Sequence, residues 1–322
     1  MFLQSLYKLK KYKHILAFSF LLSPFSLFLS SCSTFDPPLV VPIYGHIDSI
    51  HFTVPLDSLP LMGSASSKIQ YAWVYLDDNP VGAFQMPCTF PMIGASGLHN
   101  VKIYPGVTPV GTLSPAAIYP FYQFYSFNIT MNQGAKYTFH PTSVYNTWVK
   151  FPYLENFNSG SEVPGVPPSG IVGYYGDGVA ANATTTTMIV VGSPLAYQGN
   201  SGMVIVNAAH PYYIGITNPG DSLPNSSTPV YIELNYRCNT LFSVGVTEAS
   251  NDPSQGDSAN IASPTALVYP APAWTKMYIS LNTTLQQFSS ANYLHTVYFS
   301  MQWQQGDPVN DTLLLDNIKI LY

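Results

Sequence analysis

The chain has 322 residues, of which only 8% are Asp, Glu, Lys or Arg, and its formal net charge at pH 7 is −5. Arg237 is the sole arginine, and no cluster of cations occurs beyond the N-terminal segment. Nucleic-acid binding needs clustered Lys and Arg side chains and is excluded, as is electrostatic binding to anionic lipid. Polar chemistry therefore falls to Ser, Thr, Asn, Gln and Tyr.

The frequent residue types favour β-structure. Tyr (24), Pro (28) and Gly (22) are plentiful, and β-branched and aromatic residues occur in short runs that Pro, Gly and Asn interrupt. This mixture is typical of all-β exported proteins. The length is sufficient for two ordinary domains.

The N-terminus carries an export signal. Lysines at positions 8, 10, 11 and 13 precede an apolar run over residues 15–29, which is too short for a comfortable transmembrane helix and is interrupted by Pro24. Leu29-Ser30-Ser31-Cys32 then resembles the lipobox of bacterial lipoproteins. The resemblance implies a signal peptide over 1–31, a lipid on Cys32, a tether over 32–42 and an outer-membrane location in the cell envelope. The alternative is an ordinary secretory signal with an incidental Cys.

Residues 43–147 are predicted to form a first β-sandwich. A strand at Ile69–Leu76, a turn at 77–80 and a returning strand at Val81–Phe84 make a hairpin, and a later strand starts at Gly97. This part of the chain resembles the PEGA-type β-sandwich module at Trp73–Asp77, Val81-Gly82, Pro87 and Gly97-Leu98-His99. That resemblance implies an Ig-like spacer without catalysis, in which His99 is structural. The aromatic segment Tyr119–Tyr125 is either an exposed stacking platform or, as we favour, a packing element.

Residues 150–322 are predicted to form a second sandwich. Short strand-like runs recur at intervals typical of this architecture, with a single short helix candidate at 281–291. The two ends of this domain resemble the first and last strands of jelly-roll carbohydrate-binding modules and galactose-binding-like domains. The segments that carry the resemblance are Glu155-Asn156-Phe157 and Leu315-Asp316-Asn317-Ile318. This implies that the first and last strands lie side by side and that a structural Ca²⁺ has Glu155 and Asp316 as candidate ligands. Alternatively, Asp316 caps a turn and Glu155 is solvated.

The strand from Tyr231 to Arg237 is the best ligand-site candidate. Alternation places Tyr231, Glu233, Asn235 and Arg237 on one face, with Trp274 and loop aromatics (Tyr174, Tyr175, Tyr212 and Tyr213) able to complete a platform. Tyr298, Ser300, Gln302 and Gln304 form a similar polar face on a later strand. The alternative is a solvated face with an internal Glu233–Arg237 pair.

Catalysis and metal chemistry have little support in the sequence. Neither a Gly-x-Ser-x-Gly elbow nor a His-Glu-x-x-His motif occurs. Cys88 and Cys238 lie far apart in sequence, and either a disulfide or two buried thiols is compatible with them. No zinc-ligand spacing is present.

As a whole, the chain resembles two-domain, jelly-roll-ended lipoproteins of Bacteroidetes-type bacteria. The predicted fold class is all-β, with two β-sandwich domains. The predicted function is a non-catalytic envelope lipoprotein that presents a glycan- or protein-binding β-sandwich. The alternatives are a structural subunit of an outer-membrane assembly and an accessory to a glycan-degrading hydrolase.

Overall fold

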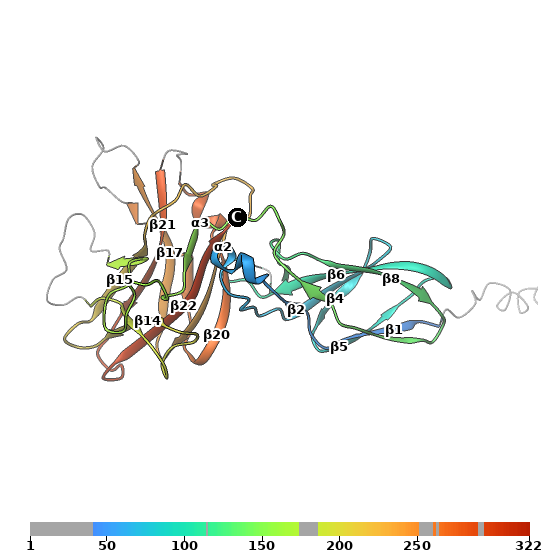
Figure 1. Cartoon of the computed structure of the whole chain (residues 1–322), viewed down its shortest axis with the longest axis horizontal. Helices are drawn as coiled ribbons and strands as arrows, with labels where there is room; N and C mark the ends of the chain where they lie inside the picture. Colours follow the sequence, from blue (N-terminus) through green and yellow to red (C-terminus); the bar gives the residue numbers. More distant parts are fainter. Residues whose placement is uncertain (1–40, 114, 174–185, 251–259, 262–263, 289–292) are drawn as a thin grey trace, which may run out of the picture. The chain divides into compact units, whose positions relative to one another are not determined.

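The computed structural model describes residues 41–113, 115–173, 186–250, 260–261, 264–288 and 293–322 (Figure 1). Residues 43–322 form one compact unit that is built almost entirely of strands, so the predicted all-β class is confirmed. The signal segment and Cys32 lie outside the described residues. Within the part of the chain that is described, no helix is long and apolar enough to cross a membrane.

The first sandwich packs two sheets against each other around a core that includes Ile47, Val74, Phe90 and Ile103. One sheet has the order β5-β1-β9, the other has the order β4-β3-β6-β7 with β8 on β6, and β10 pairs with β2 in a separate ladder. The elements are β1 (Ile43–Ile47), β2 (His51–Phe52), the 3₁₀ turn η1 (Leu56–Ser58), α2 (Leu59–Met62), β3 (Tyr71–Leu76), β4 (Asn79–Gln85), β5 (Cys88–Met92), β6 (Gly97–Val107), β7 (Ala117–Ile118), β8 (Tyr125–Met131), β9 (Lys136–Phe139) and β10 (Thr142–Ser143).

The predicted hairpin closes through a tighter turn than expected. Asp77 and Asp78 have φ of 49° and 64°, which is the left-handed geometry of a two-residue type I′ connection. His99 donates from Nδ1 to the Asp77 carboxylate (2.6 Å) and from Nε2 to the Ala95 carbonyl (2.9 Å). Both partners are acceptors, so the hydrogen bond to Asp77 raises the pKa of His99 and favours the imidazolium. His99 therefore has a structural role in this sandwich.

The second sandwich consists of two larger sheets. The sheet that we call the β16 sheet has the order β13-β14-β22-β16-β20 with β11 on β22, and the β21 sheet has the order β12-β15-β21-β17-β18 with β19 on β17. The strands are β11 (Tyr153–Glu155), β12 (Ile171–Gly173), β13 (Ile189–Val191), β14 (Ser201–Val206), β15 (Tyr212–Thr217), β16 (Tyr231–Cys238), β17 (Phe242–Ser250), β18 (Asn260–Ile261), β19 (Ala266–Val268), β20 (Ala271–Ser280), β21 (Tyr293–Gln302) and β22 (Asp311–Leu321), and a short helix, α3 (Asn282–Leu285), follows β20.

The first and last strands of this sandwich are paired with each other, as the segments around Glu155 and Asp316 predicted. β11 runs antiparallel to β22, with Tyr153 opposite Ile320 and Glu155 opposite Ile318. Side chains at alternate positions of β16, including Ile232 and Leu234, enter the core between the two sheets. Tyr231, Glu233, Asn235 and Arg237 consequently lie on the outer face of the β16 sheet.

That outer face is covered by an aromatic layer. A third cluster of buried side chains joins Tyr231, Tyr278 and Leu321 of the β16 sheet to residues from the first part of the chain. Those residues include Phe52, Tyr119, Phe121, Tyr122 and Tyr145. The aromatic segment 119–125 therefore packs against a neighbouring sheet, and the packing interpretation is confirmed.

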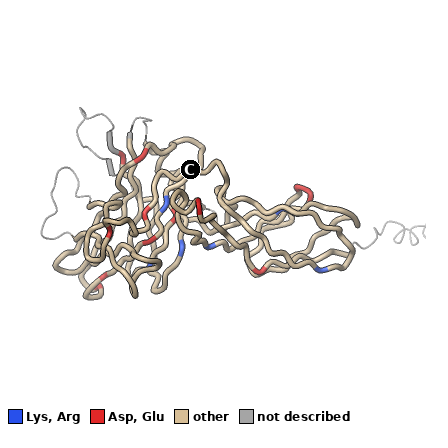
Figure 2. Tube along the Cα trace, viewed as in Figure 1, with Lys and Arg blue, Asp and Glu red and all other residues tan. Residues whose placement is uncertain are grey.

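Glu233 is fully buried in this layer, within a charged group that we call the Glu233 cluster. Its carboxylate forms an ion pair with Lys276 (2.9 Å) and accepts hydrogen bonds from Tyr119 (2.9 Å) and Tyr145 (3.0 and 3.1 Å). Lys319 donates to the Tyr145 hydroxyl (3.0 Å) and to the Ser64 carbonyl (2.6 Å). Burial alone would raise the pKa of Glu233, but Lys276 and Lys319 outweigh it and hold the pKa below its ordinary value. Figure 2 shows how sparse other charges are along the chain.

Glu233→Ala is expected to destabilise the fold strongly. Removing the carboxylate leaves Lys276 buried without the partner of its ion pair, which costs about 3–5 kcal/mol of unfolding free energy. Urea denaturation would measure this loss. Arg237→Ala is the matched control, because Arg237 is on the same strand and face but only partly buried, and its stacking on Trp274 is worth about 1 kcal/mol or less. Equal losses in the two variants would contradict the cluster.

Lys319→Met is expected to flatten the pH dependence of stability. Burial lowers the pKa of Lys319 from 10.5 to about 7, so between those values the unfolded chain binds a proton that the folded chain does not. Wild-type stability should therefore rise with pH from about 7 to about 9.5, by up to about 1.4 kcal/mol per pH unit. Urea unfolding across this range checks the slope. Lys136→Met removes an exposed lysine and should keep the slope; an unchanged slope in Lys319→Met would refute the assignment.

Candidate functional site

The face predicted from Tyr231 to Arg237 does not form an open ligand site. Tyr231, Glu233 and Asn235 are 8%, 0% and 2% exposed, respectively, and the aromatic layer covers Tyr231 and the Glu233 carboxylate. The alternation argument placed these side chains on one face correctly, but that face is buried. Glu233 pairs with Lys276 instead of Arg237.

Arg237 and Trp274 remain near one another at the end of this face. The guanidinium lies 5.8 Å from the Trp274 ring centroid, and Tyr197 packs against the same ring with 5.5 Å between centroids. Arg237 thus has an aromatic partner within the chain. Tyr174 and Tyr175 lie outside the described residues.

The outer face of the β21 sheet carries the groove that best fits a ligand. The strand register places one residue from each of β15, β21, β17 and β19 side by side, in the order Ile214, Ser300, Ser243 and Leu267. Two residues further along, on the same face, Tyr212 lies opposite Gln302. The neighbours Val244, Phe299 and Met301 point into the core. This groove, the β21 groove, has a volume of about 450 Å³ and is lined by Tyr212, Tyr213, Ile214, Leu241, Phe242, Ser243, Leu267, Ser300, Met301, Gln302 and Gln304.

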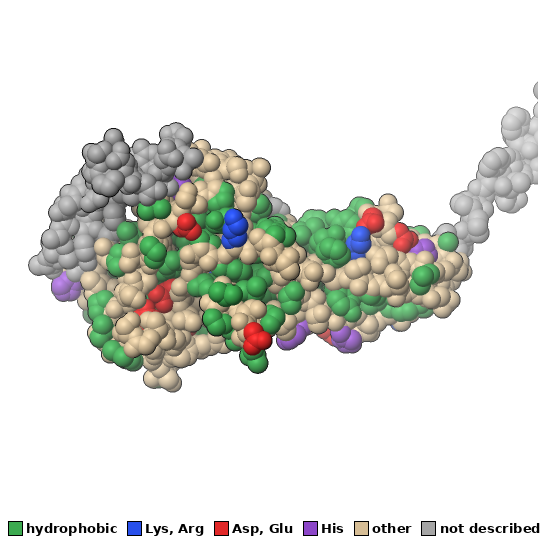
Figure 3. Space-filling model, turned by 45° about the horizontal axis from the view of Figure 1, so that its top comes forward, with side chains coloured by type: hydrophobic (Ala, Val, Ile, Leu, Met, Phe, Trp, Pro, Cys, Tyr) green, Lys and Arg blue, Asp and Glu red, His purple; other side chains and the backbone are tan. Residues whose placement is uncertain are grey.

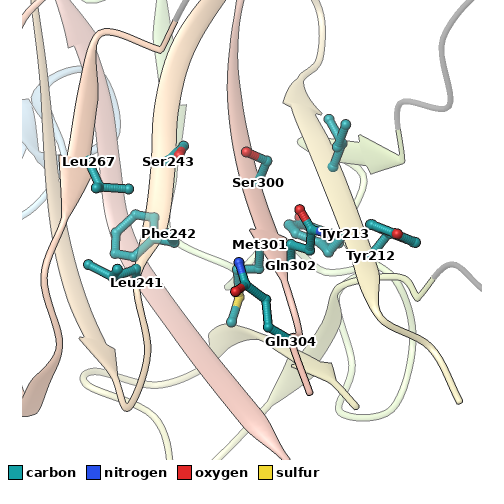
Figure 4. Close-up of a pocket in the computed structure, with 11 residues that line it drawn as sticks. Tyr212, Tyr213, Leu241, Phe242, Ser243, Leu267, Ser300, Met301, Gln302 and Gln304 are labelled. Carbon is teal, nitrogen blue, oxygen red and sulfur yellow. The ribbon is translucent and has the colours of Figure 1, made fainter. Parts of the chain in front are cut away.

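Figure 4 shows how these side chains divide the groove. Tyr212 lies at one side of the view and Leu241 and Leu267 lie at the other, with Ser300, Gln302 and Gln304 between them. Tyr212, Leu241 and Leu267 are 48%, 41% and 51% exposed, so apolar surface is open to solvent on both sides. The groove thus combines amide and hydroxyl groups with apolar walls.

Among the described residues, none that lines the β21 groove is charged. Its hydrogen-bonding groups are amides, hydroxyls and backbone, which donate and accept without selecting a charge. Tyr298 lies two residues before Ser300 on the same face of β21, and its ring packs against Gly245. A Cβ atom added to Gly245 would be only 2.4 Å from a carbon of that ring. Tyr298 therefore limits the groove at that end. This chemistry suits a neutral ligand with many hydroxyls.

The sequence identified part of this groove. Tyr212, Tyr213, Ser300, Gln302 and Gln304 were among the predicted aromatic and polar-face residues, and the structure brings them together. Tyr298 of the same predicted face is buried. Leu241, Ser243 and Leu267 were missed, because their place beside Ser300 depends on strand pairing across distant segments. Alternation within single strands gives no signal of that pairing.

The two predicted Ca²⁺ ligands have different surroundings. Glu155 is buried beside Glu162, and burial followed by that second carboxyl raises the pKa of Glu155 to about 7. Asp316 instead accepts hydrogen bonds from Ser201 Oγ (2.9 Å) and from the backbone N–H groups of Gln198 (3.2 Å) and Asn317 (2.6 Å). Glu155 and Glu162 likewise accept backbone N–H groups, from Phe157 (2.6 Å) and Ser159 (3.0 Å), but they differ from Asp316 in presenting two adjacent carboxyls, which suit a hard cation.

Cys88 and Cys238, the cysteines in the described part of the chain, are free thiols. Cys88 is partly buried and Cys238 is buried, and no disulfide joins them. Among the described residues, no group of three or more His, Cys, Asp or Glu side chains could hold a metal ion. Any cation site in this part of the chain must therefore use backbone and amide oxygens or water besides its carboxylates.

Carbohydrate-binding modules are among the solved structures that resemble parts of the chain. The family 30 module of a cellulosomal cellulase from Clostridium thermocellum is 14% identical with a TM-score of 0.35, and the match covers 48% of this chain and 93% of that chain. The Clostridium thermocellum family 11 module, in complex with a mixed-linked tetrasaccharide, is 14% identical with a TM-score of 0.33, and the match covers 52% of this chain and 93% of that chain. A xylan-binding domain from Paenibacillus barcinonensis is 13% identical with a TM-score of 0.31, and the match covers 53% of this chain and 93% of that chain.

No protein-family model and no curated protein matches the sequence. The structural likenesses have TM-scores of 0.35 or less and assign no function to this chain. The functional assignment therefore depends on the β21 groove itself.

Proposed function

We propose that this chain is a non-catalytic, lipid-anchored protein of the bacterial cell envelope that binds a neutral glycan in the β21 groove. The observation that carries the proposal is the lining of that groove. Its described residues include an exposed tyrosine, two glutamines, two serines and apolar walls, and none of them is charged. A sugar ring has an apolar face that stacks on an aromatic ring, and hydroxyls that pair with amides. The volume is within the range of ligand pockets.

The lipid anchor is the second part of the proposal. Its support is the lysine-rich start, the apolar run and the Leu29–Cys32 sequence, which lie outside the described residues. Several acyl chains on Cys32 would hold the protein at an outer membrane, since each buried CH₂ contributes ~0.8 kcal/mol. The envelope location gives a glycan-binding groove access to neutral polysaccharide.

A docking role in an envelope assembly is a second candidate, which one surface favours. The segment with η1 and α2 has no buried residue, and its Leu56 and Leu61 are 82% and 71% exposed. Figure 3 shows hydrophobic side chains spread over one face of the molecule with few charges between them. Such leucines suit a protein partner.

Tyr212→Ala is expected to weaken glycan binding about tenfold, which corresponds to about 1.4 kcal/mol. A neutral-glycan array with the purified protein would identify a ligand, and calorimetry would then compare variants. Gln302→Ala and Gln304→Ala should each cost about 0.5–1.5 kcal/mol through lost hydrogen bonds. Tyr269→Ala is the matched control, because Tyr269 is 71% exposed but does not line the groove. Absence of any bound glycan would remove this proposal and leave protein docking.

We also propose that a structural Ca²⁺ is held at Glu155 and Glu162. Ca²⁺ should raise the unfolding temperature and a chelator should lower it, since a ligand of the folded state stabilises that state by about 2.7 kcal/mol at 100 times its Kd. Thermal unfolding monitored by circular dichroism measures the difference. The Glu155→Gln/Glu162→Gln double variant should lose the response at this site, whereas Asp316→Asn should retain it. An identical melting temperature with excess Ca²⁺ and with chelator would reject the site.

A further inference from the structure

A buried carboxylate at the start of β22 has no hydrogen-bond partner. Asp311 is 0% exposed, and neither of its carboxyl oxygens receives a hydrogen bond. It precedes Leu313 and Leu315 by two and four positions along the strand, and those leucines belong to the core. An ionised carboxylate that is buried without a partner is costly, and either a bound proton or a cation must neutralise it.

A second carboxyl faces Asp311 from the preceding loop. Burial raises the pKa of Asp311, and the Asp307 carboxyl that lies beside it raises that pKa further as a like charge. Among the described residues, no lysine, arginine or histidine acts on the Asp311 carboxyl. Two carboxylates that meet without a cation repel one another.

The loop around Asp307 is held in a defined form. One Asp307 oxygen accepts the Gln304 N–H (2.6 Å), and the Asp307 N–H donates to the Gln304 carbonyl (3.0 Å). The Trp303 indole N–H donates to the Pro308 carbonyl (2.8 Å), and Gly306 provides the left-handed backbone with φ of 108°. The loop therefore fixes Asp307 next to Asp311.

We propose that Asp307 and Asp311 together hold a divalent cation, for which Ca²⁺ is the best match. Ca²⁺ takes six to eight oxygen ligands, and carboxylates are preferred. Here two carboxylates supply the charge, and backbone carbonyls and water supply the other ligands. A site with two carboxylates has modest affinity, on the order of 10⁻⁴–10⁻³ M as in extracellular modules.

This cation site is separate from the one at Glu155 and Glu162, and it is connected to the β21 groove. Gln304, whose N–H is bound by Asp307, lines the groove. The cation would thus neutralise the buried charge and also fix the loop that positions one of the groove's amides. The site itself does not depend on glycan binding.

Terbium luminescence tests the site directly. Tb³⁺ is a substitute for Ca²⁺ that emits when a nearby indole absorbs light, and Trp303 belongs to the same loop. Tb³⁺ should bind saturably to the purified protein and be displaced by Ca²⁺. Asp307→Asn and Asp311→Asn should each weaken binding about tenfold or more, because even outer-shell partners of a metal have effects of that size. Trp303→Phe should lower the emission and leave the calorimetric Ca²⁺ affinity unchanged.

Control variants separate this site from the other carboxylates. Asp48→Asn, which removes an exposed carboxylate, should change nothing. The Glu155→Gln/Glu162→Gln variant should keep the indole-sensitised signal. Circular dichroism verifies folding, and if Asp311→Asn is unfolded, the more exposed Asp307→Asn decides. No saturable binding, binding that is unchanged in Asp307→Asn, or a signal lost only with Glu155 and Glu162 would each overturn the proposal.

Discussion

The buried ion pair of Glu233 with Lys276, beside Lys319, is the interaction on which the arrangement of the second sandwich depends. A carboxylate that is 0% exposed survives in the folded chain because two lysines and two tyrosine hydroxyls surround it. These groups come from β16, β20, β22 and the aromatic segments around Tyr119 and Tyr145. One charged cluster thus ties the outer face of the β16 sheet to distant parts of the chain, and the surrounding aromatic layer excludes water from it.

This cluster has a direct consequence for function, because a sheet face that is buried within the chain cannot bind a ligand. The two outer faces of the second sandwich therefore differ. The β16 sheet carries the buried charges, whereas the β21 sheet presents neutral amides, hydroxyls and exposed apolar side chains around a groove. The loop with Asp307 lies at the end of that groove, and the proposed cation there would act on its geometry.

Much of the architecture could be predicted from the sequence. Strand runs bounded by Pro, Gly and Asn gave most of the elements of the second sandwich, and the Glu155 and Asp316 bracket predicted the pairing of β11 with β22. The site was predicted less well. Alternation correctly put Tyr231, Glu233 and Asn235 on one face, but it cannot tell whether a face meets water or another part of the chain. The aromatic density of Tyr119–Tyr125 was the signal that some polar face would be covered, and nothing local indicated which one. The same limit hid Leu241, Leu267 and Asp311, whose partners are remote in sequence.

The central claim is that the β21 face is open and that the β16 face is closed around Glu233. Hydroxyl-radical footprinting of the purified protein measures this difference residue by residue, since oxidation follows side-chain exposure. Tyr212 and Leu267 should be oxidised readily, while Tyr119, Tyr231 and Tyr278 should be protected until the protein unfolds. Oxidation of Tyr231 and Tyr278 in the native protein at the rate of Tyr212 would contradict the account and return the ligand site to the β16 sheet.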